Sequence, residues 1–135
     1  MFVLKTEIAD LNAKAYHFAR QKTMYGGKLI QAGDTVFIFA SENSGGPGLI
    51  ARATASAIAP TPRLPGIARQ TPRLSLQLER NASAMRRLGR AELKPFAQWD
   101  DGRPETELNF KLYRQATDKL IGISAEAAEF LQRYF

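Results

Sequence analysis

Cysteine is absent from the 135 residues, so disulfides and zinc sites built from thiolates are excluded. Histidine occurs once, at His17, and no carboxylate that would orient it for a serine triad can be placed from the sequence. The acidic pair Asp100 and Asp101 falls in a turn and provides too few clustered ligands for a metal ion. We therefore expect a reduced, cytoplasmic protein with no metal and no cofactor.

Long hydrophobic runs are also missing. No stretch of about 18 consecutive apolar residues occurs, which excludes a membrane-spanning helix. Only four residues precede Lys5, too few for the apolar part of a signal peptide. We expect neither membrane insertion nor export by that route.

The overall composition is that of an ordinary globular domain, with 44% hydrophobic and 24% charged residues, and we expect residues 1–135 to form a single domain. The net charge of +6 is unevenly placed. Residues 51–100 contain nine basic and three acidic residues, and eight of the nine are arginine. Because the planar arginine fork suits phosphate, this segment favours a polyanionic partner such as nucleic acid.

Most strand signals lie in the first two thirds of the chain. We expect strands at residues 1–8, 35–41, 49–58 and 73–79, from their β-forming residues and from the alternation of leucines in the last one. Residues 60–72 contain four prolines and form a loop.

Helix signals dominate the end of the chain. A period of four from Leu108 to Leu120 predicts an amphipathic helix over residues 105–119, ended by Gly122. Ser124 would cap a second helix over residues 125–133. A third, short helix is expected near residues 10–21. The predicted fold class is α+β, a mostly antiparallel sheet or barrel closed by helices.

The glycine-rich stretch Ser41 to Gly48 is a long connection between two strands, and we predict that it is the lip of a binding pocket. It lacks the lysine and the following helix of a phosphate-binding loop. Its glycines instead suggest an open excursion whose backbone amides can meet a ligand. A plain hairpin tip remains the alternative reading.

Three aromatic residues can each be read in two ways. Trp99, the only tryptophan, precedes a turn and either plugs one end of a barrel or stacks on a flat ligand. Tyr25 and Phe39 are open to the same two interpretations.

The order of elements over residues 25–58 resembles the PUA-like superfamily of small barrels, especially its EVE and ASCH branches. The resemblance rests on Lys28-Leu-Ile-Gln-Ala-Gly33-Asp34, the apolar strand 36–39, Ser41, the glycine-rich lip and the return strand Leu49-Ile-Ala-Arg-Ala53. It implies a barrel with a pocket at one end that receives a base flipped out of RNA or modified DNA. The matching positions are Phe39, Ser41 and Asn43.

We therefore expect a nucleic-acid-binding module more than an enzyme. The expected ligand-binding residues are Phe39, Ser41, Asn43, Ser44, Gly45, Trp99 and Tyr25. The expected contacts to the nucleic-acid backbone are Lys28, Arg52, Arg63, Arg69, Arg73, Arg86, Arg87 and Arg90. The alternatives are a small ASCH-like amidohydrolase using Lys28 and Glu42, and a protein-binding accessory domain. The oligomeric state stays open.

Overall fold

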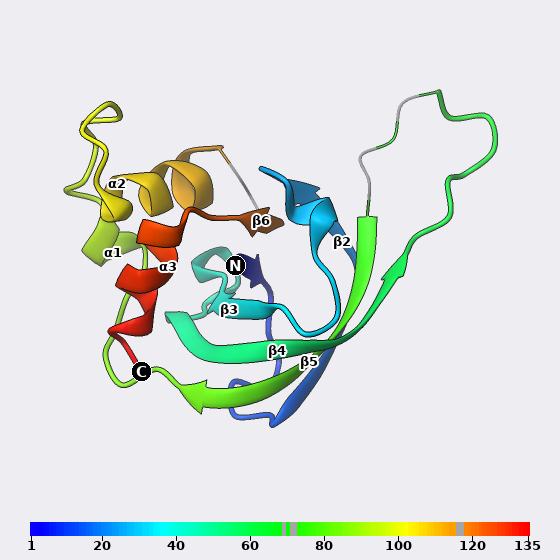
Figure 1. Ribbon diagram of the computed structural model, residues 1–135, viewed down its shortest axis with the longest axis horizontal. Coiled ribbons are helices and arrows are strands. Elements are labelled where there is room, and N and C mark those ends of the chain that lie inside the picture. Colours follow the sequence, from blue (N-terminus) through cyan, green and yellow to red (C-terminus); the bar gives the residue numbers. More distant parts are fainter. Residues whose placement is uncertain (69, 71–72, 116–117) are drawn as a thin grey trace.

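The computed structural model describes residues 1–68, 70, 73–115 and 118–135. Within this part of the chain six strands close into a barrel, and helical segments cover one side of it (Figure 1). The strands are β1 (Phe2–Thr6), β2 (Ala15–Met24), β3 (Thr35–Ala40), β4 (Gly48–Pro60), β5 (Arg73–Ser83) and β6 (Leu120–Gly122). The helical segments are η1 (Gly27–Leu29), η2 (Glu42–Ser44), α1 (Arg90–Leu93), α2 (Pro104–Asn109), η3 (Phe110–Gln115) and α3 (Ala125–Gln132).

Going around the barrel, the strand order is β1, β3, β4, β5, β2, β6. Two neighbouring pairs, β1 with β3 and β2 with β6, run parallel, and the other described pairs are antiparallel. The predicted α+β class with a mostly antiparallel barrel is confirmed. Within the described residues no helix has both the length and the apolar character needed to cross a bilayer.

Strand β3 explains why the run from residue 36 to residue 40 is continuously apolar. Val36, Ile38 and Ala40 belong to the core inside the barrel, whereas Phe37 and Phe39 belong to a second core between the barrel and the helices. All five side chains are 1% exposed or less, because side chains alternate between the two faces of a strand and both faces are covered here.

The small residues of β4 serve the barrel interior. Ala51, Ala53 and Ala55 point into the inner core beside Leu76 and Leu78 of β5. A six-stranded barrel encloses little space, so alanines leave room for the larger leucines opposite. The expected pairing of residues 49–58 with the strand at 35–41 is confirmed as β4 with β3. On its other edge β4 pairs with β5 as far as Pro60.

Helix α3 was predicted correctly. The Ser124 hydroxyl accepts a hydrogen bond from the amide of Ala127 at 3.0 Å, which caps the helix at its predicted start. Ala127, Ala128 and Leu131 are buried against the outer core.

Two predicted helices were wrong in part. The segment expected to be helical over residues 10–21 is largely β2: Tyr16 and Phe18 are half-buried and pack on the inner core, while His17 between them is exposed. This period of two outweighs the possible cap at Asp10 or Asn12.

The helix expected over residues 105–119 is α-helical only in α2 and becomes a π-helix in η3. Leu120 and Ile121 then form β6, which closes the barrel between β1 and β2. Leu120 falls on the four-residue spacing of Leu108 and Leu112, and all three are buried, so the sequence pattern of a helix continues into the strand. Residues 116 and 117 lie outside the described part.

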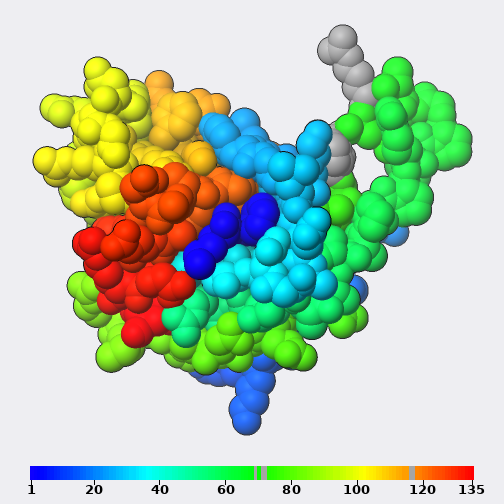
Figure 2. All heavy atoms as spheres, in the orientation of Figure 1, coloured from blue at the N-terminus to red at the C-terminus, as the bar shows by residue number. Residues whose placement is uncertain are grey.

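A loop was expected over residues 60–72. Pro60 instead ends β4, and residues 61–68 continue from it at the far end of the β4–β5 ribbon, which projects from the body of the molecule (Figure 2). Residues 69, 71 and 72 lie outside the described part. Leu64 and Ile67 are 62% and 48% exposed there. The Gln70 side chain bonds both the amide and the carbonyl of Leu64, at 3.0 and 2.8 Å.

Candidate ligand-binding site

The lip, residues 41–48, is more compact than its glycines suggested. The amides of Ser44 and Gly46 donate to the Ser41 carbonyl at 3.1 and 2.9 Å, and the Gly45 amide donates to the Glu42 carbonyl at 3.0 Å. Gly45 has φ +84°, the left-handed conformation that ends η2. These three amides are therefore already bonded inside the lip, and in this conformation they are not open donors for a ligand.

Ser41 lies where β1 and β3 end side by side. Its amide donates to the Thr6 carbonyl at 2.8 Å, which fixes the serine to β1. Its side chain is 2% exposed, and the hydroxyl has no hydrogen-bond partner among the described residues. A hydroxyl can donate one hydrogen bond and accept two, and buried polar groups are nearly always partnered. This orphaned hydroxyl is the kind of group that a ligand completes.

Glu42 follows Ser41 and is held on two sides. Its carboxylate accepts hydrogen bonds from the Tyr113 hydroxyl at 3.0 and 3.1 Å and from the Arg90 amide at 2.6 Å. The Arg90 guanidinium in turn donates to the Asn43 side-chain oxygen at 2.9 Å. A Cβ at Gly89 would lie 2.6 Å from the carboxylate, so this glycine gives Glu42 its place.

Lys5 approaches the same cluster from β1. It is 2% exposed, donates to the Leu112 carbonyl, and lies 4.6 Å from the centre of the Tyr113 ring. Burial lowers the pKa of Lys5, and the negative charges of Asp118 and Glu42 oppose this effect. We call Lys5, Ser41, Glu42, Arg90 and Tyr113 the Ser41 cluster.

The protonation of Tyr113 is fixed by its surroundings. Burial raises the pKa of its hydroxyl far above the ordinary value of 10.0, and the negative charge of Glu42 raises it further. The hydroxyl therefore stays protonated at neutral pH and donates to Glu42. The carboxylate, an acceptor of several hydrogen bonds, keeps capacity for a further donor.

The other expected ligand-binding residues are scattered. Phe39 is fully buried in the outer core, with no ring face open to a ligand in this conformation. Ser44 and Gly45 are exposed on the lip beside Asn43. Tyr25 is half-buried and contacts Lys111, whose ammonium lies 4.9 Å from the ring centre.

Trp99 lies on the outer side of the helices. It is 40% exposed, packs on Phe110 at 5.4 Å between ring centres, and has the Arg114 guanidinium 4.9 Å from its ring. With Arg103, Thr106 and their neighbours it lines a hollow of about 240 Å³. It neither plugs the barrel nor lies within the Ser41 cluster.

Lys28 and Glu42, the two residues of the hydrolase alternative, lie in different surroundings. Lys28 is exposed on η1, while Glu42 bonds Tyr113 and Arg90 as described. The buried lysine whose charge interacts with Glu42 is Lys5. Among the described residues, no three histidine, aspartate or glutamate side chains gather to hold a metal ion.

The predicted backbone-binding arginines fall into three groups. Arg52 is half-buried and donates to the Gln132 side chain at 2.7 Å next to the Phe135 ring, a packing role. Arg63 and Arg73 lie on the projecting ribbon, and Arg69 lies outside the described residues. Arg86, Arg87 and Arg90 are exposed side chains of one short segment next to the lip.

That segment borders a groove of about 420 Å³. Its lining residues are Leu11, Asn12, Pro47, Leu49, Ile50, Arg80, Ser83, Ala84, Met85, Arg86 and Arg87. Ser41 lines neither this groove nor the Trp99 hollow. A ligand that reached the Ser41 hydroxyl would therefore have to displace side chains that cover it.

The sequence had suggested Ser41 and Asn43 as ligand-binding residues, Arg90 as a backbone contact and Glu42 for the hydrolase alternative. It did not suggest Lys5 or Tyr113. Lys5 follows three apolar residues in the first strand. Its position there was the available signal, because lysine is rarely fully buried. Tyr113 carried no such signal, because it lies on a helix whose period was read as packing.

Fold and site together define a closed six-stranded barrel, within the described residues, with a polar cluster where the parallel strands β1 and β3 end. No family model and no curated protein matches the chain in sequence, but solved structures do match in fold. The DUF55 domain of human thymocyte nuclear protein 1 superposes with a TM-score of 0.68 at 16% identity, over 98% of this chain and 96% of that one. The human THYN1 protein has also been crystallised in complex with 5-methylcytosine-containing DNA, with the same TM-score and identity, over 98% of this chain and 95% of that one. A hypothetical protein from Leishmania major superposes with a TM-score of 0.62 at 19% identity, over 98% and 92% of the two chains.

Proposed function

We propose that this chain binds nucleic acid and receives one base, modified or flipped out of a duplex, at the Ser41 cluster. The observation that carries the proposal is the buried Ser41 hydroxyl without a hydrogen-bond partner among the described residues. The residue that follows it, Glu42, has a carboxylate held by Tyr113 and the Arg90 amide. A site of this kind suits a small planar ligand with both donors and acceptors on its edge.

The polar groups fit the edge of a cytosine-type base. The Glu42 carboxylate can accept from an exocyclic amino group, as acidic side chains accept from cytosine N4. The Ser41 hydroxyl can donate to a ring nitrogen or carbonyl beside it. Tyr113 and the Arg90 amide hold the carboxylate in place for that contact. The human THYN1 complex with 5-methylcytosine-containing DNA, in the same fold, supports this choice of base.

The nucleic acid must present the base outside the stack. Extrusion from a duplex costs a few kcal/mol and is cheapest for mismatched, damaged or single-stranded sites. The side chains that cover Ser41 must also move. We therefore expect tighter binding to single strands than to fully paired duplexes of the same sequence.

The test uses fluorescence anisotropy with two labelled single-stranded decamers, one with a central 5-methylcytosine and one with thymine throughout. We expect the first to bind more tightly by about tenfold, since one well-placed pair to a base edge is worth about 1–3 kcal/mol. Ser41→Ala should remove most of this preference, whereas the matched control Ser56→Ala, an exposed serine of β4 outside the lip, should keep it.

Two results would count against the proposal. One is equal affinity of the wild-type protein for both decamers. The other is a Ser41→Ala variant that keeps the preference. Glu42→Gln provides a second reading, because it replaces one accepting oxygen by a donor and should weaken binding of a base with an exocyclic amino group more than binding of thymine.

A further inference from the structure

The groove beside the lip is both positively charged and partly apolar. Three of its eleven lining residues are arginines, and no acidic residue is among them. Leu49, Ile50 and Ala84 give it an apolar floor, and Met85, 78% exposed, lies at its edge. A positively charged groove with an apolar floor matches the alternating phosphates and sugars of a nucleic-acid strand.

We propose that this groove carries the sugar-phosphate backbone next to the bound base, with Arg87 as the principal phosphate contact. The inference rests on the proposed function, since it assigns a path to the strand whose base enters the Ser41 cluster.

The groove and the Ser41 cluster are joined through the backbone. Pro47 of the lip lines the groove, and the Leu49 amide after it donates to the Leu88 carbonyl at 2.8 Å. Arg90 in the cluster follows Arg87 in the groove by three positions, and three residues span at most about 11 Å. A strand lying in the groove is therefore within a few nucleotides of Ser41.

The three arginines of the groove have different tasks. Arg80 uses its guanidinium internally, donating to the Ala13 carbonyl at 3.0 Å, the Ser83 hydroxyl at 2.8 Å and the Tyr16 hydroxyl at 3.0 Å. It thereby fastens the segment before β2, which supplies Leu11 to the groove wall. Arg80 is a positioning residue for the groove.

Arg86 is partly engaged, and Arg87 is the most available. The Arg86 guanidinium donates to the Arg133 carbonyl at 3.1 Å and lies 4.3 Å from the centre of the Tyr134 ring. Arg87 makes a long ion pair with Glu92 at 3.9 Å, between side chains that are 69% and 37% exposed. Exposed pairs of this length contribute little, so a phosphate can replace Glu92 without loss.

The experiment measures affinity for the all-thymine decamer between about 50 and 200 mM salt, because thymine lacks the exocyclic amino group that the base site selects. For a single strand, log K falls with log salt by about 0.7 for each phosphate neutralised. We expect Arg87→Ala to reduce this slope by about 0.7 and to weaken both decamers by the same factor.

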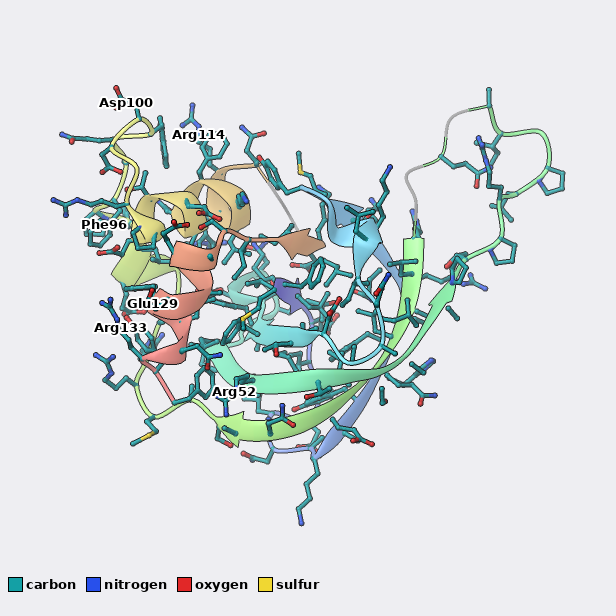
Figure 3. The ribbon with its side chains drawn as sticks, in the orientation of Figure 1. Arg52, Phe96, Asp100, Arg114, Glu129 and Arg133 are labelled. Carbon is teal, nitrogen blue, oxygen red and sulfur yellow. The ribbon has the colours of Figure 1, made fainter. Side chains whose placement is uncertain are left out.

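The matched control is Arg114→Ala. Arg114 is exposed as well, but it lies over Trp99, and Figure 3 shows it well separated from Arg133, which borders Arg86. Its loss should leave the slope unchanged. Thermal midpoints of both variants within the error of wild type would show that neither change acts through folding.

The outcomes separate the two proposals. If Arg87→Ala lowers the slope but 5-methylcytosine gives no preference, the groove stands and the base site fails. An unchanged slope in Arg87→Ala, with wild-type binding intact, overturns the groove and leaves the base site to its own test. A wild-type protein that binds neither decamer at 50 mM salt overturns both, and the arginine segment then becomes a candidate protein interface.

Discussion

Removing the Ser41 hydroxyl should stabilise the free protein. The side chain is 2% exposed and its oxygen has no partner among the described residues, so folding removes the hydroxyl from water without compensation. Such a group costs about 1–3 kcal/mol. Ser41→Ala removes that cost, while the lost dispersion contacts of one oxygen atom, about 0.1–0.2 kcal/mol each, offset part of the gain.

The net effect should be an increase of about 0.5–2 kcal/mol in the free energy of unfolding. For a domain of this size, 1 kcal/mol corresponds to roughly 3–6 °C in Tm. Urea unfolding at pH 7 measures the difference directly, and an unchanged m value would show that the unfolded state is not affected. Ser44→Ala, the same change at an exposed position, should stay within about 0.5 kcal/mol of wild type.

A loss of stability in Ser41→Ala would refute the reasoning. It would mean that the hydroxyl is already satisfied in the free protein, for instance by a bound water molecule, and the site would then lose its distinguishing feature. A gain in stability together with a loss of ligand affinity would instead identify a residue kept for binding at the expense of folding.

Three further predictions concern the surroundings of the site. Tyr113→Phe removes the hydroxyl that holds Glu42, and a lost hydrogen bond to a charged group should lower the free energy of unfolding by about 1–3 kcal/mol in urea titrations; no change would show that the carboxylate is held by the Arg90 amide alone. Gly46→Ala would place a Cβ 2.6 Å from the Ala40 carbonyl oxygen, and this overpacking of the lip against β3 should cost about 1–3 kcal/mol, measurable by calorimetry; a neutral effect would mean that the lip yields freely. Burial raises the pKa of Glu107, but the hydrogen bonds that the carboxylate accepts outweigh burial and leave its pKa below the ordinary 4.5. The resulting stability is present above pH 4.5 and is lost as the pH falls through the lowered folded-state value, so Glu107→Gln should be less stable than wild type at pH 7 and the difference should shrink in acid; a difference that is constant with pH would contradict this.

Elements that are marked by a pattern of neighbouring residues could be predicted from the sequence, whereas an element that depends on distant partners could not. The apolar run of β3, the Ser124 cap of α3 and the alternating leucines of β5 are local patterns with one physical interpretation, and each was predicted correctly. Strand β6 could not be predicted, because three residues carry too short a pattern and its pairing with β1 and β2 is a tertiary property.

For the candidate site, the sequence suggested some of the polar residues but not how distant parts of the chain bring them together. Ser41 and Asn43 follow the strongest strand, where sequence and resemblance agreed on a pocket. Tyr113 reaches Glu42 across 71 positions of the chain, and no pattern of neighbouring residues encodes such a contact. The lip was misjudged because glycines permit an open loop and a tight turn equally, and only the carbonyls around them decide which one forms.

The closed hydrogen-bonding of the lip bears on competition inside a cell. Loops that hold free nucleotides do so with rings of unpaired amides around the phosphates, and here the amides of Ser44, Gly45 and Gly46 already bond to carbonyls of the lip itself. If the cluster accepts a base, a free nucleotide therefore gains nothing from its phosphates at the lip. The soluble nucleotide pool would then be a weak competitor, and occupancy would depend mainly on polymeric nucleic acid.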